Sequence, residues 1–77
     1  MIEILSYRFN HDKIEEFRFW LNEDYIISMT QIEETMDDRL PVCFQVCYVH
    51  EKMLMLRFKE LVQATIQHQL ILNTFRR

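Results

Sequence analysis

The stretch VCFQVCYV at residues 42–49, followed two residues later by KMLMLRF at residues 52–58, decides which fold this chain can adopt. In the first stretch the even positions hold Val, Phe, Val and Tyr, and the odd positions hold Cys, Gln, Cys and Val. That two-residue alternation is typical of a β-strand. Because Gln45 is the one strongly polar side chain on either face, we expect a central strand that is covered on both sides.

The second stretch allows two interpretations. A hairpin would pair residues 52–58 with residues 42–49 across His50 and Glu51, although this tight turn lacks the Asn, Asp or Gly that such turns prefer. Alternatively, a long helix begins near Glu51, since Met, Leu, Lys and Arg are good helix formers and none of the seven residues is β-branched. We favour the hairpin because it gives a more compact domain.

Residues 59–75 are expected to be helical in either case. The polar side chains of this helix form one narrow strip, made by Lys59, Glu60, Gln63, Gln67 and Thr74. Nearly all other positions are apolar or weakly polar, and so wide an apolar arc covers more than one surface. One side can pack on a sheet, and the other needs a second helix or a second subunit. We place self-association at Leu70, Ile71 and Phe75.

The N-terminal part predicts a strand followed by a helix. Residues 1–9 carry β-branched and aromatic side chains on both faces, which indicates a strand that is not at the edge of the sheet. Asn10 then offers an N-cap for a helix from about His11 to Asn22. The apolar arc of this helix is made by Ile14, Phe17, Trp20 and Leu21. Phe19 projects from the opposite side, where it is either an exposed contact residue or the cover of a neighbouring loop.

Residues 24–32 suit a strand slightly better than a helix, and the acidic stretch EETMDDRLP at residues 33–41 is typical of a loop. Six acidic and no basic residues lie between positions 23 and 38, whereas residues 51–77 hold five bases and two acids. The acidic segment is either a solvated loop or a surface that docks onto a basic partner. In the second case its contact residues are Glu33, Glu34, Asp37 and Asp38.

Size and composition limit the chain to one domain, residues 1–77. Its 77 residues contain no glycine and one proline, Pro41, so glycine-rich phosphate loops and nucleophile elbows have no place here. The 13% aromatic content exceeds what so small a core needs, which favours a homodimer. No apolar run approaches the length of a membrane span, and the N-terminus lacks the features of a signal peptide. We therefore expect a cytoplasmic protein.

Metal and cofactor sites are not expected. Cys43 and Cys47 are interpreted as small buried hydrophobic residues with reduced thiols, because zinc needs four ligands and only His50 lies nearby. His11 and Glu15 stand at the spacing of two metal ligands on a helix, but a capping or side-chain pair explains them more simply. His68 is interpreted either as a hydrogen-bonded interfacial histidine or as a pH-sensitive contact.

The sequence does not predict an enzyme. Ser6 and Ser28 are the only serines, and neither lies in a nucleophile motif. The acidic pairs are adjacent residues, so their side chains diverge in regular structure, whereas a shared catalytic proton needs carboxyl groups that converge.

These observations predict a single α+β domain that forms a homodimer, with a small, mostly antiparallel sheet, one N-terminal helix and one C-terminal helix. The function expected is that of a small intracellular, non-catalytic protein-binding module. It would act as a regulator or inhibitor by occupying a surface of a larger partner. The alternatives are a small regulator associated with nucleic acid, and an acidic surface that imitates nucleic acid.

Overall fold

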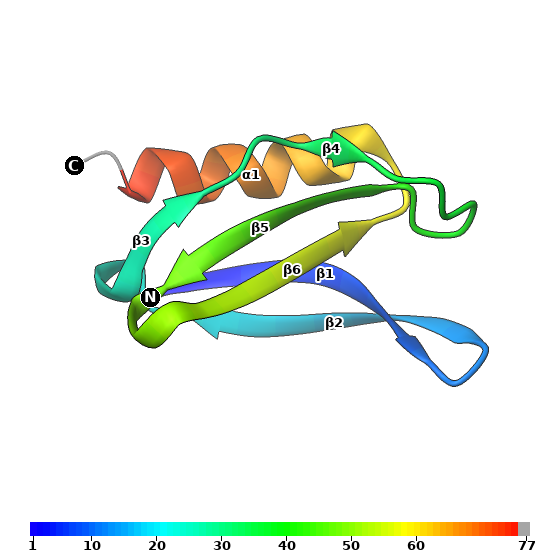
Figure 1. The fold of residues 1–77 in the computed structure, drawn as a ribbon, viewed down its shortest axis with the longest axis horizontal. Helices are drawn as coiled ribbons and strands as arrows, with labels where there is room; N and C mark the ends of the chain where they lie inside the picture. The colour runs from blue at the N-terminus through cyan, green and yellow to red at the C-terminus, as the bar shows by residue number, and fades with distance from the viewer. Residues whose placement is uncertain (76–77) are drawn as a thin grey trace.

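The computed structural model describes residues 1–75, with the side chains of Glu51 and Phe75 outside the described part. In these residues the chain forms one antiparallel sheet and one α-helix (Figure 1). The elements follow in the order β1 (Ile2–Asn10), β2 (Lys13–Leu21), the 3-10 turn η1 (Glu23–Tyr25), β3 (Ile26–Met29), β4 (Glu33–Glu34), β5 (Val42–Tyr48), the 3-10 turn η2 (Val49–Glu51), β6 (Lys52–Phe58) and α1 (Leu61–Phe75).

Two hairpins make up most of the sheet. The spatial order is β2, β1, β6, β5, β3, and the short strand β4 also pairs with β5. The hairpins β1–β2 and β5–β6 are joined in the middle, where β1 lies beside β6. Figure 1 shows α1 running along the side of the sheet that carries β5, with β2 at the rim farthest from the helix. β1 and β5 are thus interior strands, as the apolar pattern on both of their faces predicts.

The expected N-terminal helix is absent, which makes the predicted two-helix architecture wrong. The segment assigned to it forms β2, whose nine residues all lie opposite residues of β1. Phe17, Phe19 and Leu21 alternate with Glu16, Arg18 and Trp20, and aromatic side chains favour strands. Of the expected helical arc, Phe17 and Leu21 keep this two-residue period, whereas Ile14 and Trp20 fall on the other face of the strand. Pairing with β1 in a hairpin decided between helix and strand.

The C-terminal part follows the prediction more closely. Residues 52–58 form the strand β6, paired with β5 in register from Val42 opposite Phe58 to Tyr48 opposite Lys52. α1 begins at Leu61, two residues later than expected. The strand expected over residues 24–32 is confirmed only for Ile26–Met29, and the acidic loop contains the two-residue strand β4.

Both hairpins turn without glycine by placing a histidine in the left-handed region. His11 has a φ of 59° and His50 a φ of 63°. Among residues other than glycine, Asn, Asp and His adopt positive φ most readily. This solves the difficulty that the lack of a preferred turn residue raised for the β5–β6 hairpin, and it also closes the unexpected β1–β2 hairpin.

The core lies between the sheet and α1. It is built from aliphatic and phenylalanine side chains, with the rings of Phe44 and Phe58 stacked at a centroid distance of 5.6 Å. The buried cluster consists of Ile2, Ile4, Leu21, Ile26, Val42, Phe44, Val46, Leu56, Phe58, Ala64 and Ile71. Leu40 and Cys43 are also buried but lie outside this cluster. Each hairpin and the helix therefore contribute to one core.

Ser6 fastens the two hairpins together. Its side chain is buried, its hydroxyl donates to the Arg57 carbonyl at 3.0 Å, and the Arg57 N–H donates back to Ser6 Oγ at 3.1 Å. A single side chain thus satisfies both backbone groups of one β6 residue at the joint, where buried polar groups need partners.

Candidate protein-binding surface

The outward side of α1 carries exposed apolar side chains together with exposed Thr65, Gln69 and Asn73. None of its fifteen residues is charged. Val62, Ile66 and Leu70 stand four residues apart along one side of the helix, with 58%, 58% and 41% of their surface exposed, and Leu61 at the start of the helix is 54% exposed. We call Val62, Ile66 and Leu70 the α1 ridge. A ridge of this kind on a helix that faces solvent marks a surface suited to a partner.

The side of α1 that contains the polar strip turns inward instead. Gln67 Oε1 accepts a hydrogen bond from the Leu5 N–H at 3.2 Å, and the Gln63 amide donates to Tyr7 Oη at 2.9 Å. Both glutamines therefore satisfy groups of β1, and they hold the helix with its ridge outward.

His68 also holds the helix in place. Its Nε2 lies 3.0 Å from the Thr30 carbonyl, which accepts a hydrogen bond when this nitrogen carries the proton. Its ring meets the Phe44 ring edge to face, with the centroids 4.9 Å apart. This half-buried histidine therefore links α1 to the segment between β3 and β4, as expected for a hydrogen-bonded histidine.

The expected self-association residues of α1 differ in exposure. Leu70 belongs to the exposed ridge, whereas Ile71 is fully buried in the chain's own core. The side chain of Phe75 lies outside the described residues. The residues on the outer side that sequence reasoning did not select, Val62 and Ile66, have one signal in the sequence: the absence of charge from residue 61 to residue 75.

The acidic segment contains residues in two different situations. Glu33 and Glu34 form β4 and are exposed, as is Asp38. Asp37 instead accepts hydrogen bonds at Oδ1 from the Leu40 N–H at 3.1 Å and the Arg39 N–H at 2.7 Å. These two bonds hold the pKa of the Asp37 carboxyl below its ordinary value. Asp37 thus shapes the turn, whereas the side chains of the other three acids are exposed.

Phe19 and Trp20 exchange the positions expected for them. Phe19 is half-buried on β2, packs against the core and stacks on Phe17 at a centroid distance of 5.1 Å. Trp20, assigned to the apolar arc of the expected helix, is 61% exposed. Because neighbouring strand residues point to opposite faces, replacing the helix by a strand moves one ring inward and its neighbour outward.

Basic side chains gather on aromatic rings around the start of the β1–β2 hairpin turn and the end of β6. The guanidinium carbon of Arg39 lies 4.6 Å from the ring centroid of Phe9, and that of Arg57 lies 5.9 Å from it. Two further cation–π contacts join Arg8 to Phe17 and Lys59 to Tyr7. The fold thus brings together bases that are scattered in the sequence.

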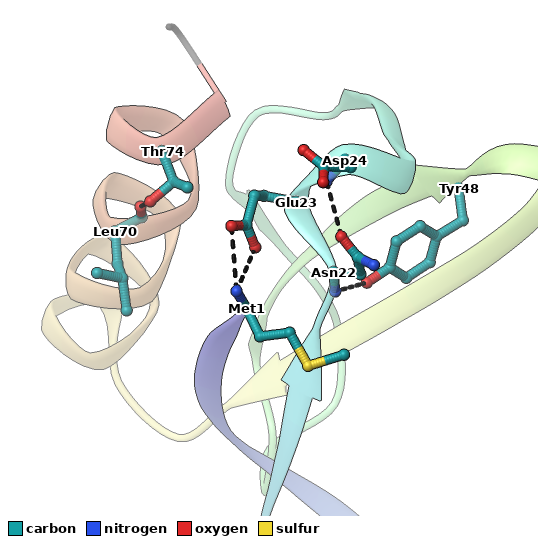
Figure 2. A network of polar contacts seen from close by, with 7 residues as sticks. All are labelled: Met1, Asn22, Glu23, Asp24, Tyr48, Leu70 and Thr74. Carbon is teal, nitrogen blue, oxygen red and sulfur yellow. Dashed lines mark hydrogen bonds and ion pairs between the residues drawn. The ribbon is translucent and has the colours of Figure 1, made fainter.

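A polar network occupies the opposite end of β2 (Figure 2). The Asn22 N–H donates to Tyr48 Oη at 3.1 Å, and Asn22 Oδ1 accepts from the Asp24 N–H at 3.0 Å, which caps η1. The N-terminal amino group lies 2.9 Å from Glu23 Oε2. Beside this network an open hollow of about 540 Å³ is lined by Tyr25, Tyr48, Val49, His50, Lys52 and Leu54.

The pairs considered as metal ligands do not form a metal site. His11 lies in a hairpin turn, while Glu15 on β2 accepts hydrogen bonds from Arg8 Nε at 2.6 Å and Asn10 Nδ2 at 3.2 Å. Cys43 is buried and Cys47 half-buried, both as free thiols. In the described part of the chain, no three His, Cys, Asp or Glu side chains come together in a way that could hold a metal ion.

Comparisons with protein families, with curated proteins and with solved structures found no match to this chain. Among the described residues, no helix has both the length and the apolar character needed to cross a membrane.

Proposed function

We propose that this chain is a small, non-catalytic, intracellular protein-binding module, a regulator or inhibitor that acts by occupying a surface of a larger partner. The α1 ridge is the surface that makes the contact. Its three side chains would enter a hydrophobic groove of the partner in the way that amphipathic helices are recognised, through apolar anchors on one side. The observation that carries the proposal is this exposed ridge on a helix without charge.

The direction in which α1 faces supports this function. Gln63 and Gln67 bond to β1, and this leaves Val62, Ile66 and Leu70 on the outward side of the helix, beside exposed Thr65, Gln69 and Asn73. A helix whose only task is to cover the sheet gains nothing from exposed Val62 and Ile66, because hydrophobic stabilisation comes from area removed from water. Exposed Glu33, Glu34 and Asp38 would complement basic residues at the rim of the partner's groove.

The test is capture of proteins from a lysate of the native cells on the immobilised chain, with quantification by mass spectrometry. Ile66→Glu places a charge in the middle of the ridge without touching the core, and Gln31→Glu adds the same charge at another exposed position. We expect proteins held by the wild-type chain and by the Gln31 variant to be lost from the Ile66 variant. Equal capture by all three chains would show that the ridge is not the contact surface.

Nucleic-acid binding is the second candidate function, and one observation favours it. Arg39 and Arg57 both lie over the ring of Phe9, and Lys59 lies over the ring of Tyr7 two residues away, although the chain carries a net charge of −3. Guanidinium groups held in this way suit the phosphates of a single strand. A gel shift with single-stranded RNA that weakens with salt, and is lost in an Arg39→Gln, Arg57→Gln double variant, would support this candidate over the first.

A further inference from the structure

β2 is a long strand with one free edge. Its nine residues pair with β1 on one side, and within residues 1–75 no strand pairs with it on the other. It contains no proline and no bulge interrupts its register. In Figure 1 it forms the rim of the sheet. Such an edge offers a row of backbone N–H and C=O groups to a further strand.

The register of the hairpin determines which residues offer those groups. Asn10 and Lys13 lie opposite each other across a two-residue turn, which requires that they exchange backbone hydrogen bonds. Such pairs alternate with pairs that do not bond, so the odd-numbered residues of β2 bond to β1. The even-numbered residues direct their N–H and C=O groups outward, and these are Ile14, Glu16, Arg18 and Trp20.

These four residues form a self-complementary sequence. When two copies of β2 pair about a two-fold axis, one residue lies opposite its own copy at the axis. This central residue can be Glu16, Phe17 or Arg18 if most of both strands is to overlap. Centring at Glu16 or at Arg18 places two like charges directly opposite each other, which is unfavourable. Centring at Phe17 places each Glu16 opposite Arg18 of the second copy, and each Ile14 opposite Trp20, with all four outward-facing residues paired.

The side chains are available for this pairing. Trp20 is 61% exposed, and the side chains of Glu16 and Arg18 are 49% and 63% exposed. Within one chain Arg18 lies 3.3 Å from Glu3 Oε1 and 3.8 Å from Glu16 Oε1, in ion pairs that solvent surrounds. Exposed pairs of this kind contribute little, so they exchange at little cost for contacts across a new strand pair.

We propose that β2 pairs antiparallel with β2 of a second copy of this chain, centred on Phe17, to form a homodimer with one continuous sheet. The two-fold axis then runs perpendicular to the sheet, and both α1 helices lie on the same face. The dimer would present two α1 ridges in one direction and could engage two equivalent grooves; this last step rests on the proposed function. The pairing itself does not depend on it.

The first test reverses the charges one at a time and then together. Glu16→Arg or Arg18→Glu alone makes both central cross-strand pairs like-charged, and we expect the dimer dissociation constant from sedimentation equilibrium to rise about tenfold to a hundredfold. The double variant E16R/R18E restores opposite charges at both positions and should recover dimerisation. Glu34→Arg on β4, at the other end of the sheet, is the matched control and should leave the constant unchanged.

A wild-type chain that sediments only as a monomer overturns the proposal. So does a dimer that the single reversals leave intact, or one that the double variant fails to restore. If Ile66→Glu dissociates the dimer and the β2 reversals do not, the α1 ridge is the dimer interface instead. None of these measurements needs a partner protein, so a failure here is distinct from a failure of the proposed function.

A cross-link tests the register. In a pair that does not exchange hydrogen bonds the Cα atoms stand about 4.5 Å apart, which a disulfide can span. Phe17→Cys should therefore form a covalent dimer under mild oxidation. Glu15→Cys is the control, because its copy would lie opposite position 19 and out of reach. Cys43 and Cys47 are present in all chains, so the wild type gives the background. Equal cross-linking at both positions contradicts the Phe17 register.

Discussion

The β1–β2 hairpin pairs nine residues on each strand and the β5–β6 hairpin pairs seven, and each turns through a histidine with positive φ. Their places in the sheet differ. β6 and β5 both have further strands beside them, whereas β2 pairs only with β1 among the described residues. The two hairpins are thus built alike, but β5–β6 lies inside the sheet, whereas β1–β2 has one edge, β2, without a second neighbouring strand among the described residues.

The burial of the two hairpins follows from these positions. On β5, Val42, Cys43, Phe44 and Val46 are all buried, whereas on β2 Leu21 alone is buried. The inner hairpin therefore provides most of the sheet's share of the core, and the outer one leaves side chains and backbone groups for contact with other molecules. The outer hairpin still adds Ile2, Ile4 and Leu21 to the same core, so the two hairpins differ in how much of their surface is buried.

The largest expected effect comes from removing one ring from each hairpin. Phe44→Ala removes a fully buried ring that contacts Phe58 and His68, and the free energy of unfolding should fall by about 3–5 kcal/mol. Phe17→Ala removes a half-buried ring stacked on Phe19, for which we expect a loss of about 1 kcal/mol. Urea unfolding followed by circular dichroism measures both. Equal losses in the free energy of unfolding would show that the two hairpins contribute equally to stability.

A smaller effect is expected at the two turns. Glycine adopts positive φ without the strain that a side chain adds, although it gives more freedom to the unfolded chain. His11→Gly should therefore raise the free energy of unfolding by about 0.5–1 kcal/mol in the same urea assay. His50→Gly should gain less, because the His50 side chain also lines the hollow beside Tyr48. A loss of stability in the His11 variant would show that its imidazole makes a stabilising contact.

Strand β5 of the inner hairpin was predictable from sequence because several observations agree on it, whereas residues 52–58 of β6 also suited a helix. Residues 42–48 alternate with apolar side chains on both faces, and no helical pattern competes with that alternation. The outer hairpin was not predictable in this way. In residues 13–21, Ile14, Phe17, Trp20 and Leu21 fit a helical arc, while Phe17, Phe19 and Leu21 fit the two-residue period of a strand. Asn10 also resembles a helix cap, because the positive φ of His11 cannot be read from the sequence.

The candidate surface was predictable in part. The excess of apolar positions in residues 59–75 correctly indicated that one side of the helix would lack a cover. Which side this would be depends on the bonds of Gln63 and Gln67 to groups of β1, more than fifty residues away in the chain. Local periodicity holds no information on such partners, so the sequence leaves open which side of the helix faces the sheet.

The smallest expected effect, and the one that separates the hairpins by sign, is the dependence of stability on pH. In the β1–β2 hairpin, the hydrogen bond from Arg8 and then that from Asn10 hold the pKa of the Glu15 carboxyl below its ordinary value of 4.5. Because this pKa is lower in the folded chain than in the unfolded one, ionised Glu15 stabilises the fold at pH values above the pKa of the unfolded state. This stabilisation is lost as the pH falls through the pKa of the folded state. Urea midpoints measured below pH 4.5 should fall less steeply with pH in Glu15→Gln than in the wild type.

In the β5–β6 hairpin the sign is opposite. Burial, and to a lesser degree the charge of Glu23, raise the pKa of the Tyr48 hydroxyl above its ordinary value of 10.0, against the hydrogen bond from the Asn22 N–H. Because this pKa is higher in the folded chain than in the unfolded one, protonated Tyr48 stabilises the fold at pH values below the pKa of the unfolded state. This stabilisation is lost as the pH rises through the pKa of the folded state. Urea midpoints above pH 10 should therefore fall less steeply in Tyr48→Phe than in the wild type, while Glu15→Gln behaves there as the wild type does. If Tyr48→Phe retained the full alkaline loss, Tyr48 would not be its source, because the removed hydroxyl can no longer ionise.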